Sequence, residues 1–509
     1  MTIDPIVRMK LTCLAALCAA LMAIPVVAEA TPNIVLLYAD DMGYGDLGVN
    51  NPASKIPTPN LDRLAAEGTR FTDAHSSSGI CTPSRYAMLT GRHHWRDFHN
   101  IVGPFDASVF KKDQLTLPAM LRDKGYTTAC IGKWHLGFDW DSIRKPGSPP
   151  KSILHSDFDW TKPFTGGPLD HGFDHYFGDN VINFPPYAWI EDDRLVLPPD
   201  TTLKLPPGKP KEGNWECRPG PARSDWDFHQ VLPTLTHKAV EYVRSQKGKQ
   251  KPFFLFMAFP SPHAPIIPND EFDGKSKAGP YGDWVVQTDD ACGQILTALH
   301  EAGLEDNTIV IFSSDNGPEI YANERDRKYD HWSSEPFRGL KQDIYEGGHH
   351  IPFLVKWPGV TKPATVSGAL ISQIDLMATF AALVNYELPR NSAEDSYDFL
   401  PFLRGQAAGP PRTTMVHNTY NNAYAIRHHD WLLVNSKTGY ARPAPMAWLK
   451  MHNTPAGHDQ PVELFNLQDD PGQRQNLAAE HPDTVADLQA LLKKIREDGH
   501  SAPRLATSD

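Results

Sequence analysis

Beyond its first 30 residues, the 509-residue sequence has no apolar run that approaches the roughly 20 residues a helix needs to cross a bilayer. It also lacks a basic excess, because 61 acidic residues outweigh 49 lysines and arginines and give a formal net charge of −12. These absences predict a soluble mature protein and argue against a general binder of nucleic acid or anionic membranes. One local pocket for an anion remains compatible with this charge.

The first 30 residues differ from the rest of the chain. Arg8 and Lys10 precede the apolar run LTCLAALCAALMAIPVV, which is followed by Ala28-Glu29-Ala30, a small-x-small cleavage pattern. This order predicts a secretory signal peptide over residues 1–30 and hence an exported protein, periplasmic or secreted. A single membrane anchor is the alternative, but the run is short for a span and closes on a cleavage-type site.

Cysteine is scarce for an exported chain. Two of the six cysteines lie in the predicted signal peptide, and four remain: Cys81, Cys130, Cys217 and Cys292. Four cysteines in so long a chain do not make a disulfide framework. If Cys81 is committed to chemistry, at most one intramolecular bridge is left, and the sequence does not identify the pair.

Several apolar, β-branched runs end in polar residues, as buried strands do. These runs are Asn33–Asp41, Tyr126–His135, Pro252–His263 and Asn307–Gly317. Helical patterns lie between them, including Thr58–Gly68, Leu115–Gly125, Val285–Gly303 and Gln373–Val384. The alternation predicts an α/β fold with a large central, mixed but mostly parallel sheet sandwiched by helices.

The length of the chain favours a large domain with a smaller companion. We expect a catalytic domain over residues 31–408 and a C-terminal α+β subdomain over residues 409–509. The subdomain carries short strand-like runs, DWLLVNS and VELFNL, and an amphipathic helix near Thr484–Arg496. These features predict a small antiparallel sheet packed by a terminal helix.

The ends of the predicted strands carry polar residues that can do chemistry. Parallel strands bring their carboxyl ends to one edge, where ligands bind. Asp40, Asp41, Asp315 and Asn316 offer only oxygen donors, which suit Ca²⁺ or Mg²⁺ rather than zinc. Helix caps and turn formers are the alternative interpretation of these four residues.

A set of cationic or titratable side chains accompanies the acidic residues: Arg85, Lys133, His135, His263 and Lys341. Any one of them alone would be interpreted as a solvated surface charge. Together with a metal ion, they could surround a tetrahedral oxyanion, as in sulfuryl or phosphoryl transfer. The two histidines could also move protons near neutral pH.

The stretch CTPSRYAMLTGR, Cys81–Arg92, contains C-x-P-S-R followed by L-T-G-R. It resembles the signature of the type I, formylglycine-dependent sulfatases, arylsulfatase-like members of the alkaline-phosphatase superfamily. The resemblance continues through NIVLLYADDMGYGDLG, GKWHLG, SPHAP, SSDNGPE, FRGLKQDIYEGGHHIPFLVKWPG and ELFNLQDDPGQRQNLA. It therefore covers nearly the whole mature chain, without a departure at a catalytic position.

The resemblance implies that a formylglycine-generating maturation enzyme oxidises Cys81 to an aldehyde, which is used as its hydrate. One hydroxyl of the hydrate would attack sulfur as the alcohol departs, and the other would let the enzyme expel sulfate by re-forming the aldehyde. Pro83 and Ser84 would belong to the sequence that the maturation enzyme reads. The oxygen at position 81 would join the cation, calcium in most relatives, with four further ligands: Asp40, Asp41, Asp315 and Asn316.

The same resemblance assigns roles to the cationic residues. Arg85 and Lys133 would hold and polarise the aldehyde hydrate, with His135 beside it. His263 and Lys341 would contact the sulfate and protonate or stabilise the leaving oxygen.

The expected function is hydrolysis of sulfuric esters of a sulfated carbohydrate or an aryl alcohol. A phosphate or phosphonate ester hydrolase of the same superfamily and an inactive sulfated-glycan-binding protein are the alternatives. A cysteine phosphatase is disfavoured because Cys81 and Arg85 are too close in sequence for the usual phosphate-binding loop. Substrate contacts are expected from the C-terminal subdomain and from Asp170–Trp189, Pro221–His229 and Tyr321–Trp332.

Overall fold

The structure is a computed structural model that describes residues 31–420 and 422–503. The predicted signal peptide lies outside the described residues. The chain divides into two units, Met1–Pro32 and Asn33–Asp509. The second unit holds every described helix and strand. The expected boundary between residues 408 and 409 falls inside this unit and stays a prediction. No described helix combines the length and apolar character needed to span a bilayer.

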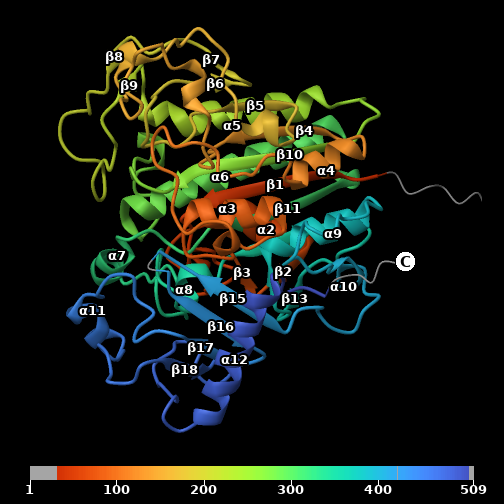
Figure 1. The fold of residues 1–509 in the computed structure, drawn as a ribbon, viewed down its shortest axis with the longest axis vertical. Helices are drawn as coiled ribbons and strands as arrows, with labels where there is room; N and C mark the ends of the chain where they lie inside the picture. Colours follow the sequence, from red (N-terminus) through yellow and green to blue (C-terminus); the bar gives the residue numbers. More distant parts are fainter. Residues whose placement is uncertain (1–30, 421, 504–509) are drawn as a thin grey trace, which may run out of the picture. The chain divides into compact units, whose positions relative to one another are not determined.

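A ten-stranded mixed sheet runs through the second unit (Figure 1). Its order is β13 (Thr365–Ser367), β2 (Thr69–Phe71), β12 (Phe353–Lys356), β11 (Thr308–Ser314), β1 (Asn33–Asp40), β10 (Phe253–Pro262), β4 (Thr127–Gly132), β5 (His175–Gly178), β6 (Ile190–Glu191) and β7 (Arg194–Leu195). The five strands from β11 to β5 are mutually parallel, whereas β12, β6 and β7 pair antiparallel with their neighbours. The predicted mixed, mostly parallel centre is therefore confirmed.

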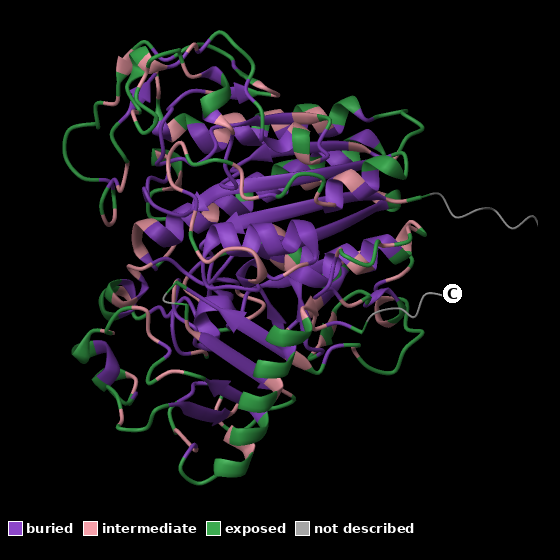
Figure 2. Ribbon diagram, viewed as in Figure 1, coloured by how far each residue is buried: buried purple, intermediate pink, exposed green. Residues whose placement is uncertain are grey.

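Helices cover both faces of the sheet, which explains the continuous apolar character of its central strands. Successive residues of β1 enter two separate hydrophobic clusters, with Ile34, Leu36 and Tyr38 in one and Val35, Leu37 and Ala39 in the other. The first cluster includes residues of α3 (Cys81–Thr90), α4 (Leu117–Asp123) and α9 (Leu376–Leu383). The second includes residues of α2 (Pro59–Glu67), α5 (Val231–Ser245) and α6 (Gly279–Ala302). Strands β1, β10 and β11 are accordingly buried along their whole length (Figure 2).

Helix α6 begins earlier than the predicted Val285. The sequence before that residue, GPYGDW, reads as a turn because glycine and proline interrupt it. In the structure Gly279 opens the helix and Pro280 occupies its first turn. A proline there removes an N–H that has no partner within the helix in any case, so the helix can start at this point.

A second, four-stranded antiparallel sheet follows near the C-terminus. It consists of β15 (Thr414–Asn418), β16 (Tyr424–His428), β17 (Trp431–Val434) and β18 (Glu463–Asn466). Helix α12 (Pro482–Asp498) buries Leu488, Leu492 and Ile495 against apolar residues of this sheet. The predicted antiparallel sheet with a terminal helix is confirmed.

Short elements complete the fold. They are β3 (Ala74–His75), paired with β14 (Ile371–Ser372); β8 (Thr201–Thr202), paired with β9 (Pro221–Ala222); and the helices α7 (Ala322–Tyr329), α8 (Glu346–His349), α10 (Leu400–Leu403) and α11 (Met446–Met451). Among these, β3 and α8 flank the chain segment that leads to Cys81.

Candidate active site

The carboxyl ends of the central strands meet at one point. In the register of the sheet, Asp40 pairs with Pro262, Ala39 pairs with Ser314, and Ala258 pairs with Gly132. The residues that follow these positions are therefore neighbours at the edge: Asp41, His263, Asp315 and Lys133. Sequence reasoning placed these side chains together on the rule that parallel strands end at a common edge.

Helix α3 brings the cysteine to this edge. Cys81 is the first residue of the helix, and every residue of α3 is buried. The next residue, Thr82, donates a hydrogen bond from its hydroxyl to the carbonyl of His135 at 2.8 Å, which fixes the helix to the loop after β4. Arg85 lies one helical turn after Cys81, so both side chains occupy one face of the helix.

Two carboxylates lie close to the cysteine sulfur. The Sγ atom of Cys81 lies 3.5 Å from Oδ1 of Asp40 and 3.9 Å from Oδ1 of Asp41. Asn316 donates from Nδ2 to Oδ1 of Asp41 at 2.7 Å, and its own Oδ1 is buried with no hydrogen-bond partner among the described residues. Asp315 accepts from the Asp41 backbone at 3.2 Å. This unpartnered amide oxygen and the crowded carboxylates fit a hard cation with oxygen ligands.

Three cationic side chains compensate the buried carboxylates. Nζ of Lys133 lies 2.6 Å from Oδ2 of Asp40, and Nζ of Lys341 lies 2.6 Å from Oδ2 of Asp41. Arg85 contacts Asp315 through Nε at 3.0 Å and through a second nitrogen at 2.9 Å. Each of these three predicted cations is therefore paired with a predicted metal ligand.

The electrostatics of the site follow from burial and these pairs. Burial alone would raise the pKa of Asp40, but Lys133, His263 and Arg85 together outweigh it and the pKa is lowered. Burial and repulsion from Asp40 raise the pKa of Asp315. Burial would lower the pKa of Lys341, but the Asp41 carboxylate holds it well above its ordinary value. Lys341 is therefore protonated at neutral pH. Burial raises the pKa of the Cys81 thiol far above the neutral range, so the unmodified side chain is a neutral thiol.

The two predicted histidines occupy different positions. His135 donates from Nε2 to the carbonyl of Val102 at 3.0 Å, and burial followed by repulsion from Lys133 lowers its pKa well below its ordinary value. His263 has its Nε2 atom 3.7 Å from Oδ2 of Asp41. His263 and Lys341 are each 8% exposed, whereas His135 is 2% exposed. His263 and Lys341 are thus the site residues that a substrate can reach.

A cavity of about 230 Å³ adjoins Lys341. Its walls combine two of the chain regions expected to bind substrate, with Tyr321 and Trp332 from the first and Arg442 and Trp448 from the C-terminal region. The expected segment Asp170–Trp189 lies elsewhere but touches the site, because Asn180 accepts a hydrogen bond from the His135 backbone at 3.2 Å and Phe184 packs edge-on against the His135 ring. No residue of Pro221–His229 lines this cavity.

A family model described as Sulfatase matches residues 32–386. The chain belongs to the sulfatase family. An N-acetylgalactosamine-6-O-sulfatase of Bacteroides thetaiotaomicron is 33% identical over 91% of this sulfatase and 93% of the relative. Arylsulfatase A of Bos taurus is 33% identical over 93% of this chain and 89% of the relative. This sulfatase is therefore a hydrolase acting on sulfuric ester bonds.

The fold comparison agrees with the sequence comparison. A solved structure described under the metabolism of multiple glycosaminoglycans by Bacteroides thetaiotaomicron superposes with a TM-score of 0.77 at 31% identity. The match covers 92% of this sulfatase and all of that chain. The predicted sulfatase fold is confirmed.

Sequence reasoning missed a support beneath Asp41. The Tyr281 hydroxyl lies 3.0 Å from the Asp41 carbonyl and 2.7 Å from Oδ2 of Asp46, and His331 contacts Oδ1 of Asp46 at 2.9 Å. Asp41 has a φ of 66°, a left-handed conformation that costs a non-glycine residue energy and needs such support. In the sequence, the position of Asp46 close to Asp40 and Asp41 was a weak indication of this supporting role. Nothing in the sequence pointed to Tyr281 or His331.

Asp179 was also missed. Its carboxyl is buried, neither oxygen has a partner among the described residues, and burial raises its pKa to about 7. It lies near enough to Lys133 and Asp40 to interact with both electrostatically.

Proposed function

We propose that this sulfatase releases sulfate from a sulfated carbohydrate, with formylglycine at position 81 as its nucleophile and a calcium ion as its metal cofactor. One observation carries the proposal: Cys81 lies against the Asp40 and Asp41 carboxylates at the strand ends, and Lys341, which pairs with Asp41, also lines a cavity. The names of the similar proteins supply the carbohydrate class, since they include an N-acetylgalactosamine-6-O-sulfatase.

The donor set fits calcium, with Mg²⁺ as the alternative ion. The ligands would be Asp40, Asp41, Asp315, Asn316 and the oxygen at position 81. When bound, the cation would neutralise charge on the sulfate, and the aldehyde hydrate would supply a nucleophilic oxygen. Release of the Lys133 and Lys341 amines from their carboxylate partners would then leave both free to bind anionic oxygen atoms.

The protein's own residues would divide the remaining work. Lys133 and Arg85, both fully buried, would orient the group at position 81, and His135 would stand beside it. Lys341 and His263, at the mouth of the site, would bind sulfate oxygens. One of these two would deliver a proton to the alcohol oxygen as its bond to sulfur breaks, so that the alcohol leaves neutral.

The cavity beside Lys341 supports a sugar as the alcohol. Among its aromatic walls Tyr321 is partly exposed and offers a ring of the kind on which sugars stack, whereas Trp332 and Trp448 are buried. Arg442 is exposed and offers a charge for an acidic substituent. Its volume of about 230 Å³ suits one terminal residue better than an extended chain.

A substrate panel tests this proposal. Protein produced with the maturation enzyme, in calcium buffer, is assayed with N-acetylgalactosamine 6-sulfate, other sulfated mono- and oligosaccharides, an aryl sulfate and an aryl phosphate. Release of sulfate from a saccharide is the expected result. Faster turnover of the phosphate ester would identify a phosphate hydrolase, and binding without turnover would identify an inactive glycan-binding protein.

Mass spectrometry of the tryptic peptide that carries position 81 tests the modification separately. An aldehyde is expected in protein from a host that has the maturation enzyme, and an unmodified thiol in active protein would contradict the proposal. Loss of activity on calcium chelation, with recovery on adding calcium, tests the ion.

A further inference from the structure

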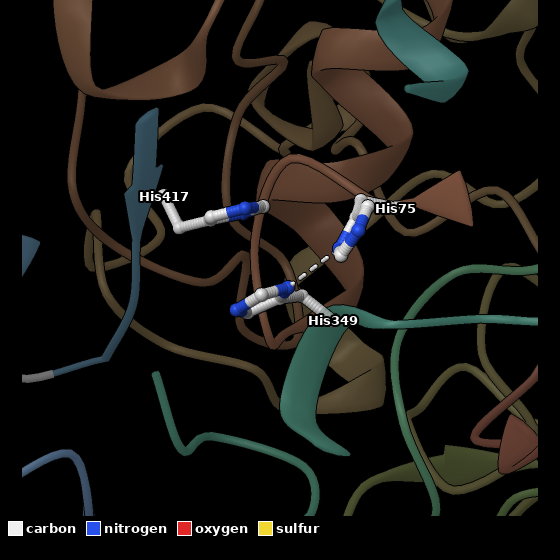
Figure 3. A group of neighbouring side chains, drawn as sticks. All are labelled: His75, His349 and His417. Carbon is white, nitrogen blue, oxygen red and sulfur yellow. Dashed lines mark hydrogen bonds between the residues drawn. The ribbon is translucent and has the colours of Figure 1, made fainter. Parts of the chain in front are cut away.

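Three buried histidines from distant parts of the chain converge outside the active site (Figure 3). His75 ends β3, His349 ends α8, and His417 lies on β15 of the C-terminal sheet. All three are 0% exposed. None belongs to the proposed catalytic set, so the cluster needs its own explanation.

Hydrogen bonds fix the protonation of two of these rings. Nε2 of His75 lies 2.8 Å from Oδ1 of Asp73, and Nε2 of His349 lies 3.2 Å from the carbonyl oxygen of Ile344. Arg427 pairs with both Asp73 oxygens, at 2.7 and 2.8 Å, and keeps that carboxylate ionised. Neither acceptor has a proton to give, so each Nε2 carries the hydrogen and each Nδ1 of a neutral ring is a bare lone pair.

The two bare nitrogens face one another. Nδ1 of His75 lies 3.1 Å from Nδ1 of His349, which is the contact drawn as a dashed line in Figure 3. Two lone pairs at this distance repel unless a cation lies between them. Two nitrogens bound to one tetrahedral zinc ion, at about 2.0–2.1 Å each, are separated by roughly 3.3 Å. The observed spacing is thus close to that of a shared metal ion.

A proton is a poor candidate for this cation. Burial lowers the pKa of His349 to about 3 and also lowers the pKa of His75. The pKa of His417 is shifted well below its ordinary value by burial and then by the neighbouring His349. Neutral imidazoles are the form in which histidine binds metal ions.

The third ring supplies the missing ligand. Both nitrogens of His417 are buried and have no hydrogen-bond partner among the described residues. The ring stacks on His349, with centroids 3.6 Å apart and planes 13° apart, so a turn about its side-chain bonds would aim a nitrogen at the pair. One nitrogen from each ring already lies within 4.8 Å of the other two. An unpartnered buried imidazole is costly, and a metal bond would remove that cost.

We propose that His75, His349 and His417 bind one transition-metal ion, with zinc as the best fit. Three imidazole ligands suit zinc and disfavour calcium, so this ion would be chemically distinct from the cation of the active site. The hydrogen bond from His75 to Asp73 is the carboxylate–histidine arrangement that commonly orients a metal ligand.

The position of the ion implies a bracing role. The His349 carbonyl accepts a hydrogen bond from the Ser76 backbone at 2.9 Å, and Ser76 starts the short segment that leads to Cys81. The metal would fasten this segment to β15 of the C-terminal sheet. Metal binding adds to the stability of the folded state. Removal of the metal would therefore destabilise residues 76–80, the segment that leads to Cys81.

Metal analysis of the full chain, produced without a histidine tag, tests the proposal. The protein is incubated with ZnCl₂ in calcium buffer and dialysed into metal-free buffer. Its metal content is then measured by inductively coupled plasma mass spectrometry. About one retained zinc ion per chain is expected. Loading with CoCl₂ should give the intense visible absorption of a tetrahedral nitrogen site, and retention of neither metal would overturn the proposal.

Variants separate this site from adventitious binding. His417→Gln, which removes a ring that makes no hydrogen bond, should weaken zinc binding by at least roughly tenfold while the protein stays folded. His171→Gln, outside the cluster, is the matched control and should retain the ion. If the double variant His75→Gln/His417→Gln retains as much zinc as the wild type, the ion sits elsewhere and the proposal fails.

Thermal unfolding in the presence of a nitrogen-based chelator that does not bind calcium provides a readout other than activity. The chelator should lower the thermal midpoint of the wild type and leave that of His417→Gln unchanged. Equal shifts in the two proteins would contradict a metal at this cluster.

Discussion

Nζ of Lys133 lies 2.6 Å from Oδ2 of Asp40, and both side chains are fully buried. Removing one partner of a buried pair leaves an uncompensated charge, which typically costs about 3–5 kcal/mol. Lys133→Met should therefore lower the free energy of unfolding by about that amount, measured by urea titration with a calcium chelator present so that no ion replaces the lost charge.

Lys55 provides the comparison for this variant. It pairs with Asp330 at 2.8 Å, but the Asp330 side chain is 96% exposed. Exposed pairs contribute about 0–1 kcal/mol, so Lys55→Met should change stability little. Similar losses of unfolding free energy in the two variants would show that the buried pair of Lys133 and Asp40 contributes no more to stability than an exposed pair.

Removal of Lys341, the lysine that a substrate can reach, should strongly impair catalysis. Lys341 is protonated and adjoins the substrate cavity, so Lys341→Met should lower kcat/KM for a sulfate ester by about 10²–10⁴-fold. Lys211→Met, at an exposed ion pair, should retain full activity. Steady-state kinetics on matured protein, with circular dichroism to confirm the fold, make the measurement. A loss under tenfold would remove Lys341 from the proposed set.

The glycine before Lys133 should be irreplaceable. At Gly132, φ is 109° and an added Cβ would lie 1.9 Å from the carbonyl oxygen of Ala258, a backbone atom of the paired strand. Gly132→Ala must displace β4 or β10 and with it Lys133. We expect a destabilised protein with sulfatase activity reduced at least roughly tenfold, because small misplacements of catalytic groups have large effects.

Gly125 separates steric clash from backbone strain. Its φ is 89°, but an added Cβ would meet nothing within 4 Å. Gly125→Ala should cost only the strain of that conformation, about 1–2 kcal/mol, and leave activity intact. Unfolding curves and kinetics for both variants decide the matter: equal effects would rule out the contact with Ala258 as the cause.

The strands and their ends could be predicted because both signals are local. The run before Asp40 and the run before Asp315 are continuous and apolar, and parallel strands must end at a common edge. Contacts between distant segments had no such signal. Tyr281 supports Asp41 across 240 residues, and His75 meets His349 across 274, separations that no local periodicity encodes.

Resemblance added what physical patterns could not supply. Spacing alone left the oxygen donors Asp40, Asp41 and Asp315 open to interpretation as caps or turn formers, and Cys81 open as a disulfide partner. In the structure the four described cysteines are all free, and Cys81 lies between two of those carboxylates. The chemistry at position 81 depends on a modification, which no folding pattern specifies.

Acid should destabilise the protein through His93 at a higher pH than through its carboxylates. Burial lowers the pKa of His93 from 6.5 to about 4. Above pH 6.5 the residue is neutral in both states; between pH 6.5 and about 4 the unfolded chain binds a proton that the folded protein does not. Stability should therefore fall as pH decreases through this window, by roughly 3 kcal/mol in total for this group.

His93→Phe isolates this contribution. The His93 ring stacks on Trp95 with centroids 5.1 Å apart, and neither nitrogen has a partner among the described residues, so phenylalanine keeps the packing and removes the titration. The variant should match the wild type near pH 7.5 and exceed it by about 3 kcal/mol near pH 4. His237→Gln, at a side chain that is 68% exposed, should follow the wild-type curve. Parallel pH curves for His93→Phe and the wild type, from urea unfolding at fixed calcium, would mean that His93 titrates alike in both states and that its burial does not disfavour the charged form.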